Sequence, residues 1–186
     1  MSILGLGSDG GGAYVRFLPS ANGWMKGGDE IQISQLIMDV DSVRTGWGKM
    51  AEGMAPEWSW DERLGVRGPQ PSPDHKRGFS IKIYGKTLGL VEWSSTGTGP
   101  CIGFDRIFTQ IWEQRADHPG QVPVVKYTGS EPMKVGKGNT RAPKFELQKW
   151  VDRPSELDDG AAAPPPAKPA PTPPRASPPA ASDDEY

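Results

Sequence analysis

The sequence of 186 residues contains a single cysteine, Cys101. One cysteine excludes an internal disulfide framework and is typical of proteins from a reducing compartment. No apolar run approaches the roughly 20 residues that a membrane-spanning helix needs. The first residues also lack the basic segment and apolar run of a secretory signal peptide. We therefore expect a cytoplasmic protein that does not insert into a membrane.

Patterns that carry catalysis or bind metals are scarce as well. His75 and His118, the only histidines, do not combine with Cys101 in a zinc-site spacing. The segment Gly85-Lys86-Thr87 lacks the first glycine of a phosphate-binding loop and precedes a predicted strand rather than a helix. A G-x-G-x-x-G spacing at residues 5–10 has too few residues before it to follow a strand. We expect no enzyme activity, no cofactor and no metal site.

The acidic residues leave one catalytic alternative open. Asp39 and Asp41 lie on one face of a predicted strand, as the metal-binding carboxylates of a nuclease can. Asp61 or Glu92 would have to supply further metal ligands. A restriction-type nuclease core would need a lysine where this chain has Ser94. A metal-dependent nuclease is therefore the less favoured alternative.

Proline and alanine dominate the C-terminal part. Residues 161–182 include nine prolines and no apolar side chain larger than alanine, so this segment cannot bury enough surface to fold. Residues 154–186 are predicted to be a disordered linker with an acidic tip. The glycine-rich residues 1–12 are expected to form a flexible arm. Residues 13–153 remain for one folded domain.

Charge is divided unevenly between the domain and the tail. Residues 1–150 carry 18 lysines and arginines against 16 acidic residues, whereas residues 151–186 carry 3 against 7. A slightly basic body with an acidic tail is expected when the tail competes with an anionic ligand for a basic surface.

Residues 78–95 are predicted to form the central β-hairpin, because apolar and polar residues alternate along the first half of this segment. If Gly85-Lys86 forms the turn, Tyr84 and Trp93 lie on the outer face beside Lys82. A sheet face with two aromatic rings and a lysine can stack nucleobases. The alternative is that both rings pack beneath another layer of the protein.

The remaining periodic segments indicate a mainly β fold. Strands are predicted at residues 13–18, 30–43, 122–127 and 144–151, and one amphipathic helix at residues 101–115. Beginning with the long strand at 30–43, the order is strand, hairpin, helix, strand, strand. This order predicts a five-stranded OB-fold barrel with the helix between strands 3 and 4.

Three tryptophans lie outside any periodic segment. Trp47, Trp58 and Trp60 are close to glycine and proline residues. Tryptophans in such loops often bind a ligand. The alternative is that they cover the ends of the core.

The overall organisation resembles single-stranded DNA-binding proteins of bacteria and their phages: a predicted OB domain, a proline-rich linker and an acidic tip with a terminal aromatic residue. The segments Thr45-Gly46-Trp47, EGMAPEW at 52–58, KRGF at 76–79 and VPVVK at 122–126 resemble a tailed-phage group of these proteins. The resemblance implies sequence-tolerant binding of single-stranded DNA in replication and recombination, without a cofactor. It also implies that the tip recruits replication and recombination proteins. The tip departs from the bacterial pattern because no Ile-Pro precedes Tyr186.

The predicted site combines aromatic residues that stack on bases with basic residues that contact phosphates. The predicted DNA-binding residues are Trp47, Trp58, Trp60, Lys76, Arg77, Lys82, Tyr84, Lys86, Trp93, Lys126, Tyr127, Lys134, Lys137 and Arg141. The predicted partner-binding tip consists of Asp183, Asp184, Glu185 and Tyr186. A homo-oligomer is compatible with these features. The main alternative function is an OB-like protein-interaction module without DNA affinity.

Overall fold

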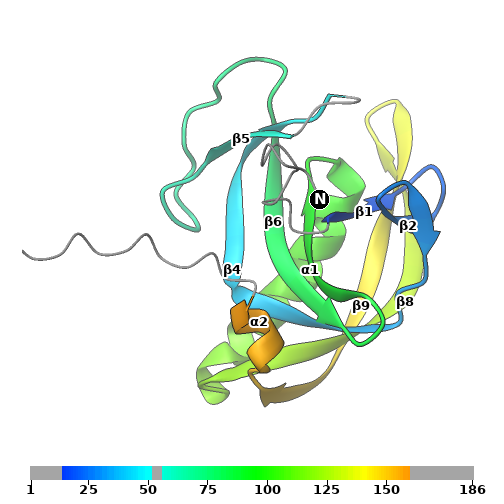
Figure 1. Ribbon diagram of the computed structural model, residues 1–186. Coiled ribbons are helices and arrows are strands. Elements are labelled where there is room, and N and C mark those ends of the chain that lie inside the picture. The colour runs from blue at the N-terminus through cyan, green and yellow to red at the C-terminus, as the bar shows by residue number, and fades with distance from the viewer. Residues whose placement is uncertain (1–13, 52–55, 160–186) are drawn as a thin grey trace, which may run out of the picture.

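A computed structural model of the protein describes residues 14–51 and 56–159 (Figure 1). The predicted N-terminal arm, the linker beyond residue 159 and the acidic tip lie outside the described residues. The described strands are β1 (Tyr14–Leu18), β2 (Gly23–Lys26), β3 (Asp29–Ile31), β4 (Gln35–Lys49), β5 (Glu57–Trp60), β6 (Lys76–Gly85), β7 (Gly89–Ser95), β8 (Gln121–Val135) and β9 (Gly138–Asp152). The helices are α1 (Thr98–Gln114), a 3₁₀ turn (Arg115–Asp117) and α2 (Ser155–Asp159).

The prediction of a mainly β protein with one long helix is confirmed, and the sheet curls into a half-barrel (Figure 1). The predicted number of five strands is wrong, because the described residues contain nine. The sheet order is β3-β2-β1-β7-β6-β4-β8-β9, and β5 pairs with β4 outside this path. The five expected strands correspond to β4, β6, β7, β8 and β9. β1 confirms the strand predicted at residues 13–18, outside the five barrel strands. The additional strands are β2, β3 and β5, which are too short to show a clear alternation.

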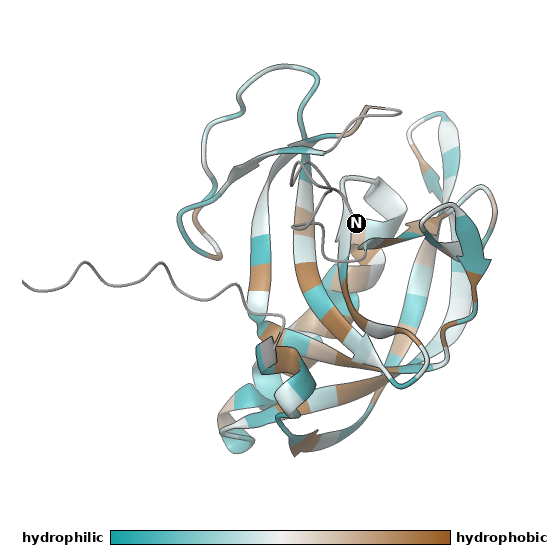
Figure 2. Cartoon of the chain, in the orientation of Figure 1, coloured by the Kyte–Doolittle hydropathy of each residue, from teal (hydrophilic) through white to brown (hydrophobic). Residues whose placement is uncertain are grey.

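The long strand β4 connects the two halves of the sheet. Its first part pairs with β8 at Gln35–Ile37, and its length from Ile37 to Gly48 pairs with β6. The register shifts between Asp39 and Arg44, as in a β-bulge, and such a bulge bends a strand and increases its twist. Beyond the bulge, the edge opposite β6 pairs with β5 instead of β8. Figure 2 shows apolar and polar bands alternating along β4 and β6, as expected for strands with one buried face.

The register of the β6–β7 hairpin differs from the prediction. Ile83 pairs with Val91 and Ile81 with Trp93, a displacement of three residues from the predicted pairing of Ile83 with Leu88. The turn comprises the three residues between Gly85 and Gly89, and Gly89 takes a φ of 73° that favours glycine. An odd displacement exchanges the two faces of a strand. Trp93 therefore points into the core, and its predicted position on the outer face is wrong.

An aromatic cluster fills the core. Trp93 is fully buried, and its ring centre lies 5.0 Å from that of Trp24 and 4.8 Å from that of Phe79. Phe79 stacks on Phe104 of α1 with a centroid distance of 4.1 Å. The helix predicted at residues 101–115 is thus confirmed as part of the core. None of the helices within the described residues is long and apolar enough to cross a membrane.

Helix α1 approaches β9 closely through two glycines. A Cβ atom on Gly99 would lie 2.2 Å from the carbonyl oxygen of Arg141, and one on Gly103 would lie 2.4 Å from that of Pro143. No larger residue fits at either position without separating the two elements. This contact fixes α1 against β9 and leaves its N-terminus beside β6.

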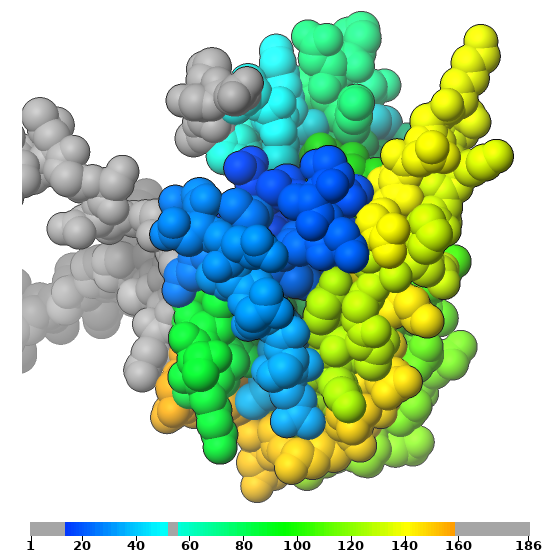
Figure 3. Space-filling view, turned by 90° about the vertical axis from the view of Figure 1, so that its right-hand side faces the viewer, coloured from blue at the N-terminus to red at the C-terminus, as the bar shows by residue number. Residues whose placement is uncertain are grey.

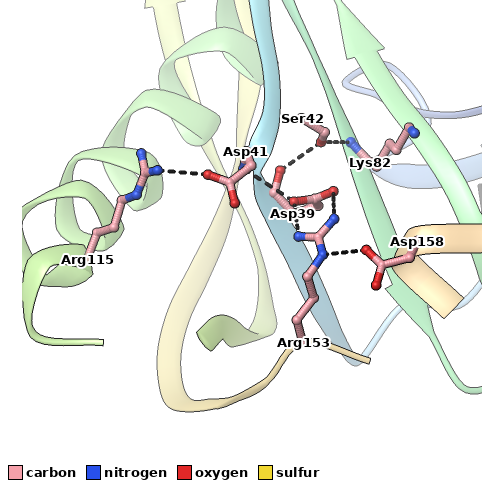
Figure 4. Close-up of polar contacts among 7 residues, drawn as sticks. All are labelled: Asp39, Asp41, Ser42, Lys82, Arg115, Arg153 and Asp158. Carbon is pink, nitrogen blue, oxygen red and sulfur yellow. Dashed lines mark hydrogen bonds and ion pairs between the residues drawn. The ribbon is translucent and has the colours of Figure 1, made fainter. Parts of the chain in front are cut away.

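The ordered contacts continue past Pro154, where the sequence predicts the folded domain to end. Helix α2 follows directly, and Leu157 on it is fully buried. The guanidinium of Arg153 donates hydrogen bonds to both carboxylate oxygens of Asp39, at 2.8 and 3.0 Å, and to Asp158 at 2.7 Å (Figure 4). These contacts attach the end of the described chain to β4.

Replacing Trp93 by alanine should lower the free energy of unfolding by about 3–5 kcal/mol, because it opens a cavity in the core. Urea unfolding at neutral pH measures this change. Trp112→Ala is the matched control, because Trp112 on α1 is 47% exposed and its loss should cost about 1 kcal/mol or less. Equal and small effects of both substitutions would contradict the observed register.

Candidate nucleic-acid interface

Two tryptophans of β5 form a stacked pair. Trp58 and Trp60 pair with Gly48 and Gly46 of β4, and alternate residues of a strand point to the same side. Their ring centres are 4.4 Å apart and their planes differ by 7°. Both side chains are half-buried. The pattern Trp-Ser-Trp therefore places two parallel rings on one face of the sheet.

Three glycines form the floor beneath this pair. A Cβ atom on Gly48 or Gly78 would lie 2.8 or 2.9 Å from the ring of Trp58, and one on Gly46 would lie 3.1 Å from the ring of Trp60. Larger residues at these positions would displace the rings. Because Gly46 and Gly48 of β4 and Gly78 of β6 have no side chains, both tryptophan rings can lie across these two strands.

An arginine extends the stack. The guanidinium carbon of Arg44 lies 4.2 Å from the ring centre of Trp60, within cation–π distance. Arg44 also lies 4.0 Å from the carboxylate of Glu92, which accepts a short hydrogen bond from the Ser80 hydroxyl. We call Arg44, Trp60 and Trp58 the tryptophan shelf. Within the described part of the chain, no ring or guanidinium covers the face of Trp58 that points away from Trp60.

The loop of residues 61–75 beside the shelf is held by Asp61. The carboxylate accepts hydrogen bonds from Arg77 at 2.5 and 2.8 Å, from the Thr45 hydroxyl at 2.6 Å and from the Gly68 amide at 3.0 Å. These donors, above all the Arg77 guanidinium, hold the pKa of Asp61 well below its usual value. One carboxylate therefore joins β4, β6 and the loop.

Trp47 supports the same loop from below. Its side chain is largely buried, and its indole N–H donates a hydrogen bond of 2.8 Å to the Gly68 carbonyl. Arg67 and Arg77 lie over its ring at 4.6 and 5.4 Å. Trp47 is thus not part of the tryptophan shelf, although it lies on the same strand as Arg44.

Two further aromatic residues of the predicted site are part of the core or pack against it. Trp93 is fully buried, so it cannot contact DNA on the surface, and its assignment to the site is corrected. Tyr127 is half-buried, and its ring centre lies 5.7 Å from those of Trp24 and Phe145. Burial raises the pKa of the Tyr127 hydroxyl.

The predicted basic residues separate into two groups. Lys76 and Arg77 begin β6 beside the shelf, and Lys134 and Lys137 lie at the tip of the β8–β9 hairpin, which projects from the body (Figure 3). Arg141 on this hairpin donates hydrogen bonds to Asn22 and Ser130. The other group, Lys82, Lys86 and Lys126, lies towards the end of β6 and in the first half of β8, and the predicted aromatic residue Tyr84 lies near it on β6. Figure 1 shows β5 and the β8–β9 tip at the same end of the molecule.

The carboxylates of the nuclease alternative do not converge. Asp39 is bound by Arg153, and Asp41 accepts a hydrogen bond of 2.8 Å from Arg115 (Figure 4). Asp61 is bound by Arg77 on another part of the sheet. No group of three or more potential metal ligands exists among residues 14–51 and 56–159.

Arg44 and the glycine floor are the residues of the shelf that the sequence did not predict. Two signals were present: the tryptophans are spaced to share one strand face, and Gly46 and Gly48 have the same spacing. Glycines inside a strand often mark the close approach of another group. Arg44 carried no comparable signal.

Comparison with protein-family models, curated proteins and solved structures gives no match for this chain. Its function is therefore inferred from the shelf, the basic residues and the fold.

Replacing Asp61 by asparagine should lower the free energy of unfolding by about 2–3 kcal/mol at pH 7, because Arg77 loses its buried ionic partner. The folded-state pKa of Asp61 is lowered, so its stabilising effect is complete above the unfolded pKa of about 4 and is lost at lower pH. The difference between wild type and Asp61→Asn should therefore shrink between about pH 4 and pH 2. Urea unfolding at several pH values measures it, and a difference that stays constant down to pH 2 would contradict this role.

Proposed function

We propose that this protein binds single-stranded DNA without strong sequence preference, by stacking bases on the tryptophan shelf. The observation that carries the proposal is the parallel, half-buried pair Trp58–Trp60, which has Arg44 stacked on one side and no ring or guanidinium among the described residues on the other. Aromatic side chains bind bases of any sequence, because every base has a flat π-face. A base stacked on Trp58 would continue the row of Arg44, Trp60 and Trp58.

The strand order supports an OB fold. The segment β7-β6-β4-β8-β9 of the sheet has the order 3-2-1-4-5 when these strands are numbered along the chain, with α1 between the third and fourth. This arrangement is the one expected of an OB barrel. OB folds bind oligonucleotides on the face of strands 2 and 3 and through the loops that follow strands 1 and 4. The shelf adjoins this face. The connection after strand 1, which is β4, contains β5, and the connection after strand 4, which is β8, is the tip of the β8–β9 hairpin.

Basic residues at the shelf end provide phosphate contacts. Lys76, Lys134 and Lys137 are exposed, and none of them has an ion-pair partner among the described residues. Each phosphate that a lysine neutralises releases counterions, so affinity should fall as the salt concentration rises. The second basic group, around Lys86 and Lys126, lies at the other end of β6 from the shelf. It is therefore not on the shortest path of a DNA strand across the shelf.

The acidic tip is proposed to act on the same surface. Asp183, Asp184, Glu185 and Tyr186 would compete with DNA for the basic residues and recruit replication or recombination proteins. The support for this part is the charge distribution of the sequence and the resemblance noted above. It is separable from the shelf, since binding of DNA needs only the folded domain.

Trp58→Ala should weaken binding of oligo-dT by about 5- to 100-fold, because one stacked base is lost. Tryptophan fluorescence or anisotropy of labelled oligo-dT, measured at about 0.05 and 0.3 M salt, gives the affinity and its salt dependence. Trp112→Ala is the matched control, because Trp112 is exposed on α1 and lies outside the shelf. If wild type does not bind oligo-dT at low salt, the protein is better described as an interaction module without DNA affinity.

Removal of residues 160–186 should raise the affinity for oligo-dT at low salt and abolish recruitment of partner proteins. The gain should shrink towards about 0.3 M salt, because both the tip and the DNA are then screened. The truncation is placed after Asp159 because Leu157 belongs to the core. Replacing the three acidic tip residues by Asn and Gln is the companion variant, and unchanged affinity in both at every salt concentration would contradict competition by the tip.

A further inference from the structure

A cavity of about 830 Å³ adjoins β4 and β6, mainly on the side of β4 that faces away from the shelf. Lys76 and Gly78 of its lining pair with Gly48 and Gly46 and lie at its border with the shelf. Its walls come from β4, β6, the loop of residues 61–75 and the first turns of α1. Alternation along β4 explains the two sides: Arg44, Gly46 and Gly48 face the shelf, whereas Thr45 and Trp47 line the cavity. Its size lies in the range of small-molecule binding sites.

The rear of the cavity is aromatic. Phe79 and Phe104 stack at 4.1 Å, and Phe108 lies 5.4 Å from Phe104 along α1. Ile102 and Leu64 complete the apolar lining. A flat, apolar group fits such a wall, because offset and edge-to-face ring contacts are favourable there.

The cavity also carries positive charge. Arg67 and Lys76 line it, are exposed, and have no carboxylate partner within the described residues. Arg77 is neutralised by Asp61. Helix α1 begins at the cavity with Thr98 and has no acidic residue in its first turn, so the positive end of its dipole adds to this charge. Asp105 is the acidic residue of the lining.

The cavity and the shelf meet at Thr96. This residue lines the cavity. Its methyl group lies 2.7 and 2.9 Å from the positions that a Cβ atom would take on Gly48 and Gly78, the glycines under Trp58. A strand of DNA that leaves Trp58 in this direction therefore passes Thr96 and enters the cavity.

We propose that the cavity takes one nucleotide of the bound single strand, with the base against the phenylalanine wall and its phosphate between Arg67 and Lys76. The aromatic wall can contact a base, and the two cations, which have no carboxylate partner among the described residues, can contact its phosphate. This inference rests on the proposed function, because it extends the same DNA path beyond the shelf.

Cys101 provides a reporter inside the cavity. It is the only cysteine of the chain, belongs to the first turn of α1 and lines the cavity. Burial raises the pKa of its thiol to about 11, so alkylation is slow near neutral pH and is best followed at about pH 9. A nucleotide in the cavity would block the reagent.

The experiment measures the alkylation rate of Cys101 by iodoacetamide in the full chain, with and without saturating oligo-dT. Shelf occupancy is followed in the same samples by tryptophan quenching. We expect oligo-dT to slow alkylation by about fivefold or more. Arg67→Ala should remove most of this protection while shelf quenching persists. Arg63→Ala, an exposed arginine of the same loop outside the cavity lining, is the matched control and should keep the protection.

The outcomes separate the two proposals. Quenching by oligo-dT with an unchanged alkylation rate would overturn the cavity assignment and leave the shelf intact. Protection that is equal in Arg67→Ala and Arg63→Ala would overturn the phosphate contact and with it the nucleotide assignment. Absence of both quenching and protection would overturn the proposed function itself.

Discussion

The structure depends on β4 serving both halves of the sheet. This one strand pairs with β6 along most of its length, with β8 before the register shift and with β5 after it. The shift between Asp39 and Arg44 lies between the β8 pairing and the β5 pairing, where it bends and twists the strand. The tryptophan shelf and one wall of the cavity are placed by the part of β4 beyond this point.

Alternation along that part produces two different surfaces from five consecutive residues. Arg44, Gly46 and Gly48 support the shelf, and Thr45 and Trp47 support the loop over the cavity. The loop is fixed by Asp61, whose pKa is lowered first by the Arg77 guanidinium and then by the hydrogen bonds from Thr45 and Gly68. Since Arg77 is occupied by Asp61, the positive charge at the cavity comes from Arg67 and Lys76 instead. The same strand thus positions both the stacked rings of the shelf and the loop that brings Arg67 to the cavity.

Sequence reasoning succeeded where the pattern was long and strictly periodic. The buried face of β4, with Leu36, Met38 and Val40, and the helix α1 follow directly from such periodicity. It failed at the β6–β7 turn, because the segment from Gly85 to Gly89 is compatible with two turn lengths and only core packing selects between them. The volume of Trp93 decides the choice, since it fills the space between Trp24 and Phe79. Short strands such as β5 are equally hard to predict from the sequence, because β5 is held by contacts with glycines of another strand.

The attachment of the C-terminal part limits how the tail can act. Arg153 binds Asp39 and Leu157 is buried, so the predicted linker begins at the β8 end of β4. From Asp39 to Gly48 the strand spans roughly 30 Å. The 27 residues beyond Asp159 have a maximum reach of about 90 Å, so the tip can arrive at the shelf while α2 stays in place. The proposed competition between the tip and DNA would therefore require no movement of the folded domain, and linker length and charge would set its strength.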